Sequence, residues 1–208
     1  MWLSILITVL VGYLLGNLNG AYSMSVLLAH EDVRTKGSGN AGLTNFIRNF
    51  GAANGLLVLL IDAGKAVVSC LAGGLLLKPY GYYLEGAALG GAMVMLGHVF
   101  PALLGFKGGK GILSGLFIAV VVDWRIALLI LAVFAAAYFT TQYVSLGSVL
   151  AATAFGIGFA VFHHNSVPVV ICGVFMSLLA IFMHRENILR LLKGQERKTN
   201  LFGKGEKK

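Results

Sequence analysis

The chain has 208 residues, of which 58% are hydrophobic and only 12% are charged. A water-soluble core of this size cannot bury so much apolar surface, so the composition excludes a soluble globular protein and indicates an integral membrane protein. The formal charge of +8 raises the alternative of a nucleic-acid partner. However, the basic residues are not interleaved with aromatic ones, and half of them lie at 185–208, which favours a basic tail at a membrane surface over nucleic-acid binding.

Three apolar runs in the first half of the chain, at about 2–28, 52–77 and 84–105, are each long enough to cross a bilayer as a helix. The first run carries no charged residue, has no basic segment before it and is too long for the core of a signal peptide. We therefore expect it to be retained as a membrane span.

The second half of the chain contains a shorter apolar run at 111–122 and a long one at 126–184, which has no Asp, Glu, Lys or Arg. Polar stretches at 140–148 and 163–168 divide the long run into three expected helices. The sequence therefore predicts an all-α integral membrane protein with seven transmembrane helices in a single domain over 1–208. The short fourth run has an alternative as a re-entrant segment, which would reverse the direction of every later helix.

Basic residues are distributed very unevenly over the two sides that a seven-helix topology defines. One side carries 13 of the 16 Lys and Arg residues, and the other has only Lys78 and Arg125. The basic side consists of the loops 30–51, 105–111 and 142–148 and the basic tail 185–208. Because positive residues concentrate on the cytoplasmic side, the N-terminus is predicted outside and the C-terminus in the cytoplasm.

The loop FKGGKG at 106–111 combines glycines with two lysines between apolar runs. Glycines allow backbone N–H groups to converge on an anion, and Lys107 and Lys110 add positive charge, so the loop is a candidate phosphate-binding site. The glycines assigned to this site are Gly108, Gly109 and Gly111. The loop lacks the earlier glycine and the Ser or Thr of a Walker A motif, so we expect neither a nucleotide nor a metal cofactor. The alternative is a flexible basic turn without a ligand.

A second glycine-rich stretch, GSGNAGLTNFIR at 37–48, belongs to the same predicted face. Gly37 and Gly39 free the backbone for unusual conformations. The side chains that offer neutral hydrogen bonds are Ser38, Asn40, Thr44 and Asn45. A helix is expected to start near Thr44, and Arg48 on that helix can bind a carboxylate or phosphate in bidentate fashion. The alternative is a capped helix start with an interfacial arginine.

His184, Asn187 and Arg190 recur at intervals of three where the last apolar run ends, so they can project from one face of a helix. His184 is either an interfacial polar residue or, beside two anion-binding loops, a general base or phosphate ligand. In the stretch HVFP, Pro101 is expected to bend the end of the third span and to aim His98 inward.

Two other polar pairs interrupt the apolar runs. Asp62 and Lys65 are three residues apart inside the second span, where charged side chains are unfavourable unless paired, so we expect an ion pair with a structural role. His163 and His164 raise the alternative of a metal site. No further Cys, His or carboxylate is close to them in sequence, so no metal is expected there.

Together these stretches resemble the bacterial membrane-bound acyl-phosphate:glycerol-3-phosphate acyltransferase family (PlsY). The first family motif commonly reads GSGNPGATNVLR and is matched at 37–48. The second, HxFPxxxxFKGGKG, is matched at 98–111. The third includes SLGS and HRxNIxRLxxGxE, which are matched at 145–148 and 184–196. The chain departs from the first motif at Ala41 and Leu43; neither is a reacting group, so we expect altered loop stiffness and retained chemistry.

The resemblance implies a seven-helix fold with a cytoplasmic active site in the bacterial inner membrane, and we expect a functional monomer. It implies that the hydroxyl of glycerol 3-phosphate attacks a long-chain acyl phosphate, giving lysophosphatidate and inorganic phosphate in the first acylation step of phospholipid synthesis. The His-x4-Asp motif of other glycerol-phosphate acyltransferases is absent from the sequence. The proton acceptor is therefore either His184 or the phosphate of the substrate.

The candidate site residues fall into two groups. The candidate catalytic residues are Ser38, Arg48, Lys110, His184 and Asn187. The candidate substrate-binding residues are Gly37, Gly39, Asn40, Thr44, Asn45, His98, Lys107, Gly108, Gly109, Gly111, Ser145, Ser148 and Glu196. The alternative function is a transporter for a phosphorylated or lipidic anion, which is disfavoured because the sequence shows no paired halves with interrupted helices at the midplane.

Overall fold

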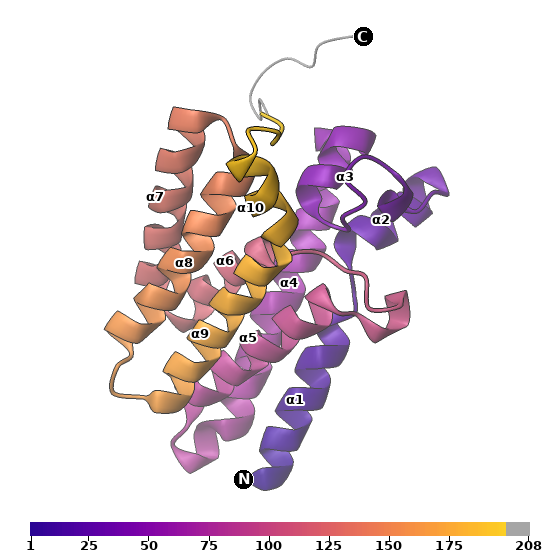
Figure 1. Cartoon of the computed structure of the whole chain (residues 1–208). Helices are drawn as coiled ribbons and strands as arrows, with labels where there is room; N and C mark the ends of the chain where they lie inside the picture. Colours follow the sequence, from indigo (N-terminus) through magenta and orange to yellow (C-terminus); the bar gives the residue numbers. More distant parts are fainter. Residues whose placement is uncertain (199–208) are drawn as a thin grey trace.

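The structure is a computed structural model that describes residues 1–198 (Figure 1), so the last ten residues of the predicted basic tail lie outside the described residues. The described residues form ten α-helices and three 3-10 helices, without a β-strand. The α-helices are α1 (Trp2–Gly16), α2 (Gly20–Ala29), α3 (Leu43–Phe50), α4 (Ala52–Leu77), α5 (Tyr83–Val99), α6 (Ile112–Val122), α7 (Trp124–Thr141), α8 (Val144–Phe162), α9 (Val167–Met183) and α10 (Arg185–Leu192). The 3-10 helices are η1 (Val33–Thr35), η2 (Lys78–Tyr80) and η3 (Ala102–Leu104). The all-α prediction is confirmed.

Five stretches of the described chain are long and apolar enough to cross a membrane, and a sixth results if α9 and α10, bent by 55° at their junction, form one span. The expected helices at 52–77 and within 126–184 are found as α4 and as α7, α8 and α9. α6 has only 11 residues, fewer than a bilayer requires. The predicted multi-pass helical architecture is therefore present with five or six spans by length and composition, and the number seven is not reached by that criterion.

The first expected span, 2–28, consists of two helices instead of one. The side chain of Asn19 caps the start of α2 by accepting a hydrogen bond from the backbone N–H of Tyr22 (2.8 Å). The side chain of Asn17 donates to the carbonyl of Tyr13 at the end of α1 (2.7 Å). Two asparagines within an apolar run thus end one helix and begin the next, because their amides bond to the backbone groups that a helix end leaves exposed.

Glycines allow the helices of the first half to pack with their backbones in contact. α5 contacts α1, α4, α6 and α9 and so lies at the centre of the bundle. A Cβ atom at Gly16 or Gly97 would collide with the backbone of the facing helix, α5 or α1 respectively. The same holds for Gly73 and Gly86 between α4 and α5. Small residues at helix contacts are typical of membrane bundles, where close van der Waals packing drives association.

The polar stretches identified in the sequence gather toward one end of the bundle. α2, α3, α10 and the connection between α7 and α8 lie at one end of the bundle, whereas the N-terminus and the connections α4–α5 and α8–α9 lie at the other end (Figure 1). We call these the α3–α10 end and the opposite end. The α3–α10 end comprises 30–51, 100–111, 142–148 and 184–198, and the opposite end comprises 78–82, 123–125 and 163–166.

Candidate active site

The loop before α3 is built around the side chain of Asn45, which is buried. Its amide nitrogen donates to the carbonyls of Val33 (3.1 Å), Lys36 (3.0 Å) and Asn40 (3.1 Å). Its amide oxygen accepts from the backbone N–H of Ser38 (3.0 Å). These bonds engage both the oxygen and the nitrogen of the side-chain amide, so Asn45 shapes the loop. A direct contact between Asn45 and a substrate would require these hydrogen bonds to break.

The loop that Asn45 shapes presents the other candidate groups of this stretch at the surface. Gly37 and Gly39 adopt φ of +59° and +70°, a region that favours glycine. The exposed or half-buried side chains here are Ser38, Asn40, Thr44 and Arg48. α3 begins at Leu43, so the prediction of a helix starting near Thr44 is confirmed.

Arg34, which none of the sequence motifs includes, ties this loop to the glycine loop. It binds Asp32 through Nε and Nη2 at 2.8–3.0 Å and donates from Nη1 to the carbonyl oxygens of Leu104 (2.7 Å) and Lys107 (3.4 Å). These hydrogen bonds hold the pKa of Asp32 below its usual value. Arg34, Gly39 and Lys107 line a polar hollow between the two loops. The sequence shows only an Asp-x-Arg pair at this position, and that pair alone does not indicate a role in joining the loops.

The glycine loop, 105–111, requires glycine at both of its ends. Gly105 adopts φ of +65° and Gly111, which precedes α6, adopts φ of +82°. Between them, Lys107 is exposed and Lys110 is half-buried. The loop therefore presents one lysine toward the hollow beside Arg34 and directs the other toward α10.

The two central glycines of the loop, Gly108 and Gly109, do not have the backbone arrangement that was predicted for phosphate binding. The N–H groups of Gly108 and Gly109 donate to the carbonyls of Val99 and His98, both at 3.1 Å. These amides are thus committed to the end of α5 and do not converge on an anion, so the positive charge of the loop comes from its lysines. His98 was predicted to contact substrate; it is turned inward, as expected from the sequence, but it is buried with Nδ1 2.8 Å from the Lys65 ammonium.

Lys110 reaches from the glycine loop to α10, where its ammonium group donates to the side-chain oxygen of Asn187. The amide nitrogen of Asn187 donates to Glu196 (2.8 Å), and Nε of Arg190 donates to the other carboxylate oxygen of Glu196 (2.7 Å). A carboxylate only accepts hydrogen bonds, so Glu196 fixes the Asn187 amide with its oxygen toward Lys110. Lys110 and Asn187, two predicted catalytic residues, are therefore brought together, and Glu196 orients Asn187.

The electrostatics of this cluster favour an anion. Burial lowers the pKa of Lys110, and the nearby charge of Arg190 lowers it further. Burial raises the pKa of Glu196, but hydrogen bonds from Arg190 and Asn187 outweigh it and keep this pKa below its usual value. Three cations act here, Lys110, Arg185 and Arg190, against the two carboxylates of Glu186 and Glu196, and a phosphate group can neutralise the remaining positive excess.

His184 lies buried at the junction of α9 and α10, and its Nδ1 is 2.8 Å from the carbonyl oxygen of Ala180. Because a carbonyl only accepts, Nδ1 carries the hydrogen, and in the neutral ring Nε2 has the lone pair. His184 is therefore in the tautomer that can take up a proton at Nε2. Ser145 and Ser148 are buried in the first turns of α8, which contacts α10.

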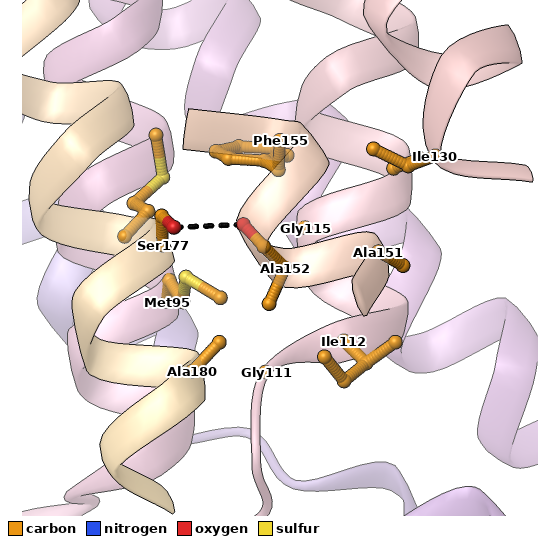
Figure 2. Close-up of a pocket in the computed structure, with 11 residues that line it drawn as sticks. Met95, Gly111, Ile112, Gly115, Ile130, Ala151, Ala152, Phe155, Ser177 and Ala180 are labelled. Carbon is orange, nitrogen blue, oxygen red and sulfur yellow. Dashed lines mark hydrogen bonds between the residues drawn. The ribbon is translucent and has the colours of Figure 1, made fainter. Parts of the chain in front are cut away.

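A small apolar cavity lies among α5, α6, α7, α8 and α9 (Figure 2). Its wall includes Gly111, next to the half-buried lysine of the glycine loop, and Ala180, one turn before the α9–α10 junction. It continues to Met95, Ala151 and Phe155. The cavity has a volume of about 20 Å³. Its walls are apolar except for Ser177, and its volume is about that needed for one water molecule, so an acyl chain enters it only if the surrounding helices separate.

Comparison with known proteins agrees with this architecture. Residues 6–194 match the family model for glycerol-3-phosphate acyltransferase. The chain is 39% identical over 200 residues to the glycerol-3-phosphate acyltransferase of Clostridioides difficile (strain 630), covering 94% of this chain and 95% of that protein. It is 40% identical over 191 residues to the protein of the same name from Anaeromyxobacter dehalogenans (strain 2CP-1 / ATCC BAA-258), covering 90% and 94%.

Two solved structures are also similar to this chain. The crystal structure of PlsY (YgiH), an integral membrane glycerol 3-phosphate acyltransferase, in its glycerol 3-phosphate form has a TM-score of 0.85 and 33% identity, covering 96% of this chain and 100% of that one. The lysophosphatidic acid form has a TM-score of 0.79 and 33% identity, covering 95% and 96%. Fold and similarity thus place the chain among integral membrane acyltransferases. It belongs to the glycerol-3-phosphate acyltransferase family, and the resemblance noted from its motifs is confirmed.

Proposed function

We propose that the chain transfers a long-chain acyl group from acyl phosphate to glycerol 3-phosphate, giving lysophosphatidate and inorganic phosphate, in the first acylation step of phospholipid synthesis. The proposal rests on family membership and on one structural observation: the glycine loop carries both Lys110, whose ammonium group donates to Asn187, and Gly111, which lines the apolar cavity. The reaction brings a phosphorylated, water-soluble acceptor to an apolar acyl donor. The boundary between these two environments is where both substrates can meet.

Cationic and polar groups at the α3–α10 end bind and orient the phosphate groups of the two substrates. Lys107 and Lys110 supply positive charge. The residues that orient the substrates are Ser38, Asn40, Arg48, Ser145, His184 and Asn187. Three further residues act indirectly, by positioning the substrate-binding side chains. The polar atoms of Asn45 bond to the backbone, those of His98 contact Lys65, and those of Glu196 bond to α10. All of these residues belong to one chain, and we propose a functional monomer.

In the reaction, the glycerol 3-phosphate hydroxyl forms a bond to the acyl carbonyl carbon, and the bond from that carbon to the phosphate oxygen breaks. The hydroxyl proton passes to Nε2 of His184 or to a phosphate oxygen, and inorganic phosphate leaves. Acyl phosphate is a mixed anhydride with a good leaving group, so catalysis depends mainly on positioning and on stabilising negative charge. We assign that stabilisation to the Lys110 ammonium group, which precedes Gly111 of the cavity wall in the chain and donates to Asn187.

We place the α3–α10 end on the cytoplasmic side of the bacterial inner membrane, with the N-terminus outside and α6 counted as a seventh, short crossing. The support for this orientation is the concentration of Lys and Arg in the segments of that end. Single cysteines at Ser38 and Tyr82 should react with an impermeant thiol reagent from the inside and the outside, respectively. Labelling of both from one side would contradict the orientation.

The assay that tests the function uses purified protein, acyl phosphate and glycerol 3-phosphate, with release of phosphate and formation of lysophosphatidate as readouts. We expect turnover without added nucleotide, in the presence of a metal chelator, and none with acyl-CoA as donor. Turnover with acyl-CoA and none with acyl phosphate would overturn the donor assignment. Uptake of glycerol 3-phosphate by proteoliposomes without product formation would support the transporter alternative instead.

A further inference from the structure

Two charged residues lie buried inside α4, below the loops of the α3–α10 end. Asp62 and Lys65 are one turn apart, their side chains are each 2% exposed, and the distance from Nζ to Oδ1 is 2.8 Å. The sequence predicted this ion pair, and the structure confirms it. Charged groups at such a depth are unfavourable and rare, so further partners for them are informative about function.

Both members of the pair bind the break between α1 and α2. The Lys65 ammonium donates to the carbonyls of Gly16 (3.3 Å) and Leu18, where α1 has ended. Asp62 Oδ1 accepts from the backbone N–H of Gly20 (3.2 Å), where α2 begins. A cation thus meets the carbonyl end of one helix and an anion meets the amide end of the next, which is the favourable sign at each terminus. The pair thereby supplies partners for backbone groups that a broken helix leaves exposed.

The network extends from Lys65 to His98 at the end of α5. Nδ1 of His98 lies 2.8 Å from Nζ of Lys65 and 3.6 Å from Oδ1 of Asp62, and Nε2 is on the other side of the ring. That side of the ring packs against Gly109: a Cβ atom there would collide with Nε2 and would lie 3.1 Å from the carbonyl oxygen of Ala41. His98 therefore touches the glycine loop beside the backbone of the loop before α3.

The break itself also binds the loop before α3 and the 3-10 helix η3 directly. The side chain of Asn19 donates to the carbonyl of Ala41 (3.0 Å), and the side-chain oxygen of Asn17 accepts from the backbone N–H of Leu103 (3.1 Å). The loop before α3 and the 3-10 helix η3, which leads into the glycine loop, are thus anchored to one short, non-helical segment. The ion pair fixes the conformation of that segment.

We propose that Asp62, Lys65 and His98 are positioning residues for acyl transfer, a role that rests on the proposed function. The Asp62–Lys65–His98 network sets the break between α1 and α2, and through Ala41 and Gly109 it sets the spacing of the two substrate-binding loops. The network touches no reacting atom. Its removal displaces Lys107 and Lys110 relative to Ser38 and the loop before α3, and such displacements reduce turnover strongly.

The test compares His98→Ala with Phe159→Ala, a matched control at a fully buried core position in α8, far from the loops. We measure kcat, the KM for glycerol 3-phosphate and thermal unfolding in detergent for each folded variant. We expect His98→Ala to lose about 10²-fold in kcat/KM. Phe159→Ala should lower the unfolding temperature at least as much while kcat and KM stay within about twofold of wild type. His98→Asn, which retains an acceptor for Lys65, should recover part of the loss.

A double-mutant cycle keeps the test independent of Lys65 variants that fail to fold. Gly109→Ala alone should reduce kcat/KM because its methyl group meets the His98 ring, and His98→Ala combined with Gly109→Ala should be no worse than His98→Ala alone. Additive losses, or a His98→Ala enzyme that is less stable with wild-type kinetics, would overturn the positioning role. A wild-type protein without acyltransferase activity would overturn the proposed function, and the positioning role with it.

Discussion

The two ends of the molecule carry the same local structure. Asp32 and Arg34 at the α3–α10 end, and Asp123 and Arg125 at the opposite end, are both Asp-x-Arg pairs. In each, the aspartate accepts the arginine backbone N–H, at 2.8 and 2.9 Å, and Nη2 lies 2.8 and 2.6 Å from Oδ2. In each, hydrogen bonding from the arginine side chain is the main cause of a lowered aspartate pKa.

The two pairs have different neighbours and therefore connect different segments of the chain. Arg34 extends to the carbonyl of Leu104 (2.7 Å) and thereby joins two loops that are 70 residues apart in sequence. Arg125 instead lies over the ring of Phe162 (4.5 Å), and its aspartate faces His163 (3.1 Å), so this pair joins two helix connections. The same Asp-x-Arg ion pair fixes a candidate binding loop at one end and two helix connections at the other. Its role is therefore set by tertiary partners and not by its sequence.

The largest difference between the ends should appear when one lysine is removed from each. Lys110→Ala removes a half-buried charge from the candidate anion site, and we expect kcat/KM to fall about 10²–10³-fold, as for a truncated charge pair in a desolvated site. Lys78→Ala removes an exposed charge at the opposite end and should leave steady-state kinetics unchanged. Steady-state assays with both substrates measure the two effects.

Lys110→Arg is the matched control for charge. It keeps the cation and should retain part of the activity. Because the pKa of Lys110 is lowered, its charge is lost at a lower pH than that of an ordinary lysine, so the alkaline decline of kcat/KM should move to higher pH in Lys110→Arg. Equal activity of Lys110→Ala and Lys78→Ala would mean that the glycine loop does not bind substrate.

The two buried or half-buried histidines at the helix connections give the next comparison. If His184 takes the proton, His184→Gln should leave KM nearly unchanged and lower kcat about 10²–10⁴-fold. If the substrate phosphate takes it, the same variant should raise KM with a smaller loss of kcat, and we expect this second result because the leaving group is good. His163→Gln at the opposite end should change neither constant. Wild-type kinetics in both variants would remove His184 from the site.

Much of this architecture could be predicted from the sequence, because hydrophobic length and charge asymmetry act locally. The helices at 52–77 and within 126–184, the Asp62–Lys65 ion pair and the family were all predicted. The break in the first span was not, because Asn17 and Asn19 interrupt an apolar run too briefly to alter its average hydropathy. The break that Asn17 and Asn19 produce depends on hydrogen-bond partners at positions 41, 62–65 and 103, which are distant in sequence and come close only in the folded protein.

The candidate site was predicted in composition but not in geometry. The motifs identified Lys110 and Asn187, and the fold places them in contact. The same motifs assigned Gly109 and His98 to the substrate, whereas the amide of one donates to α5 and the ring of the other is buried against Lys65. A motif reports which residues are required, and it does not distinguish a residue that touches the ligand from one that holds its neighbour in place.

The arginines of the two Asp-x-Arg pairs allow a smaller test of the same comparison. Arg34→Gln breaks the connection to the glycine loop and should raise the KM for glycerol 3-phosphate about tenfold, since the loop is displaced but not removed. Arg125→Gln should leave KM unchanged and act on stability alone. A rise in KM with Arg125→Gln equal to that with Arg34→Gln would contradict the assignment of separate roles.

The smallest expected effect concerns the apolar cavity. Ala151→Leu adds volume to the cavity wall, and we expect the KM for acyl phosphate to rise about fivefold while the KM for glycerol 3-phosphate stays constant. Leu150→Ala changes a lipid-facing neighbour on α8 and serves as the control. An equal rise in both KM values for Ala151→Leu would indicate a general distortion of the site instead of a place for the acyl chain.

The most direct test of the central claim measures where glycerol 3-phosphate binds. Single cysteines are introduced at Thr35, which is exposed beside the polar hollow of the α3–α10 end, and at Tyr82 at the opposite end, after Cys70 and Cys172 are replaced by alanine. The rate of reaction with a thiol reagent is measured with and without saturating glycerol 3-phosphate. We expect slower labelling at Thr35→Cys and an unchanged rate at Tyr82→Cys. Unchanged labelling at Thr35→Cys, or protection at Tyr82→Cys, would contradict the central claim.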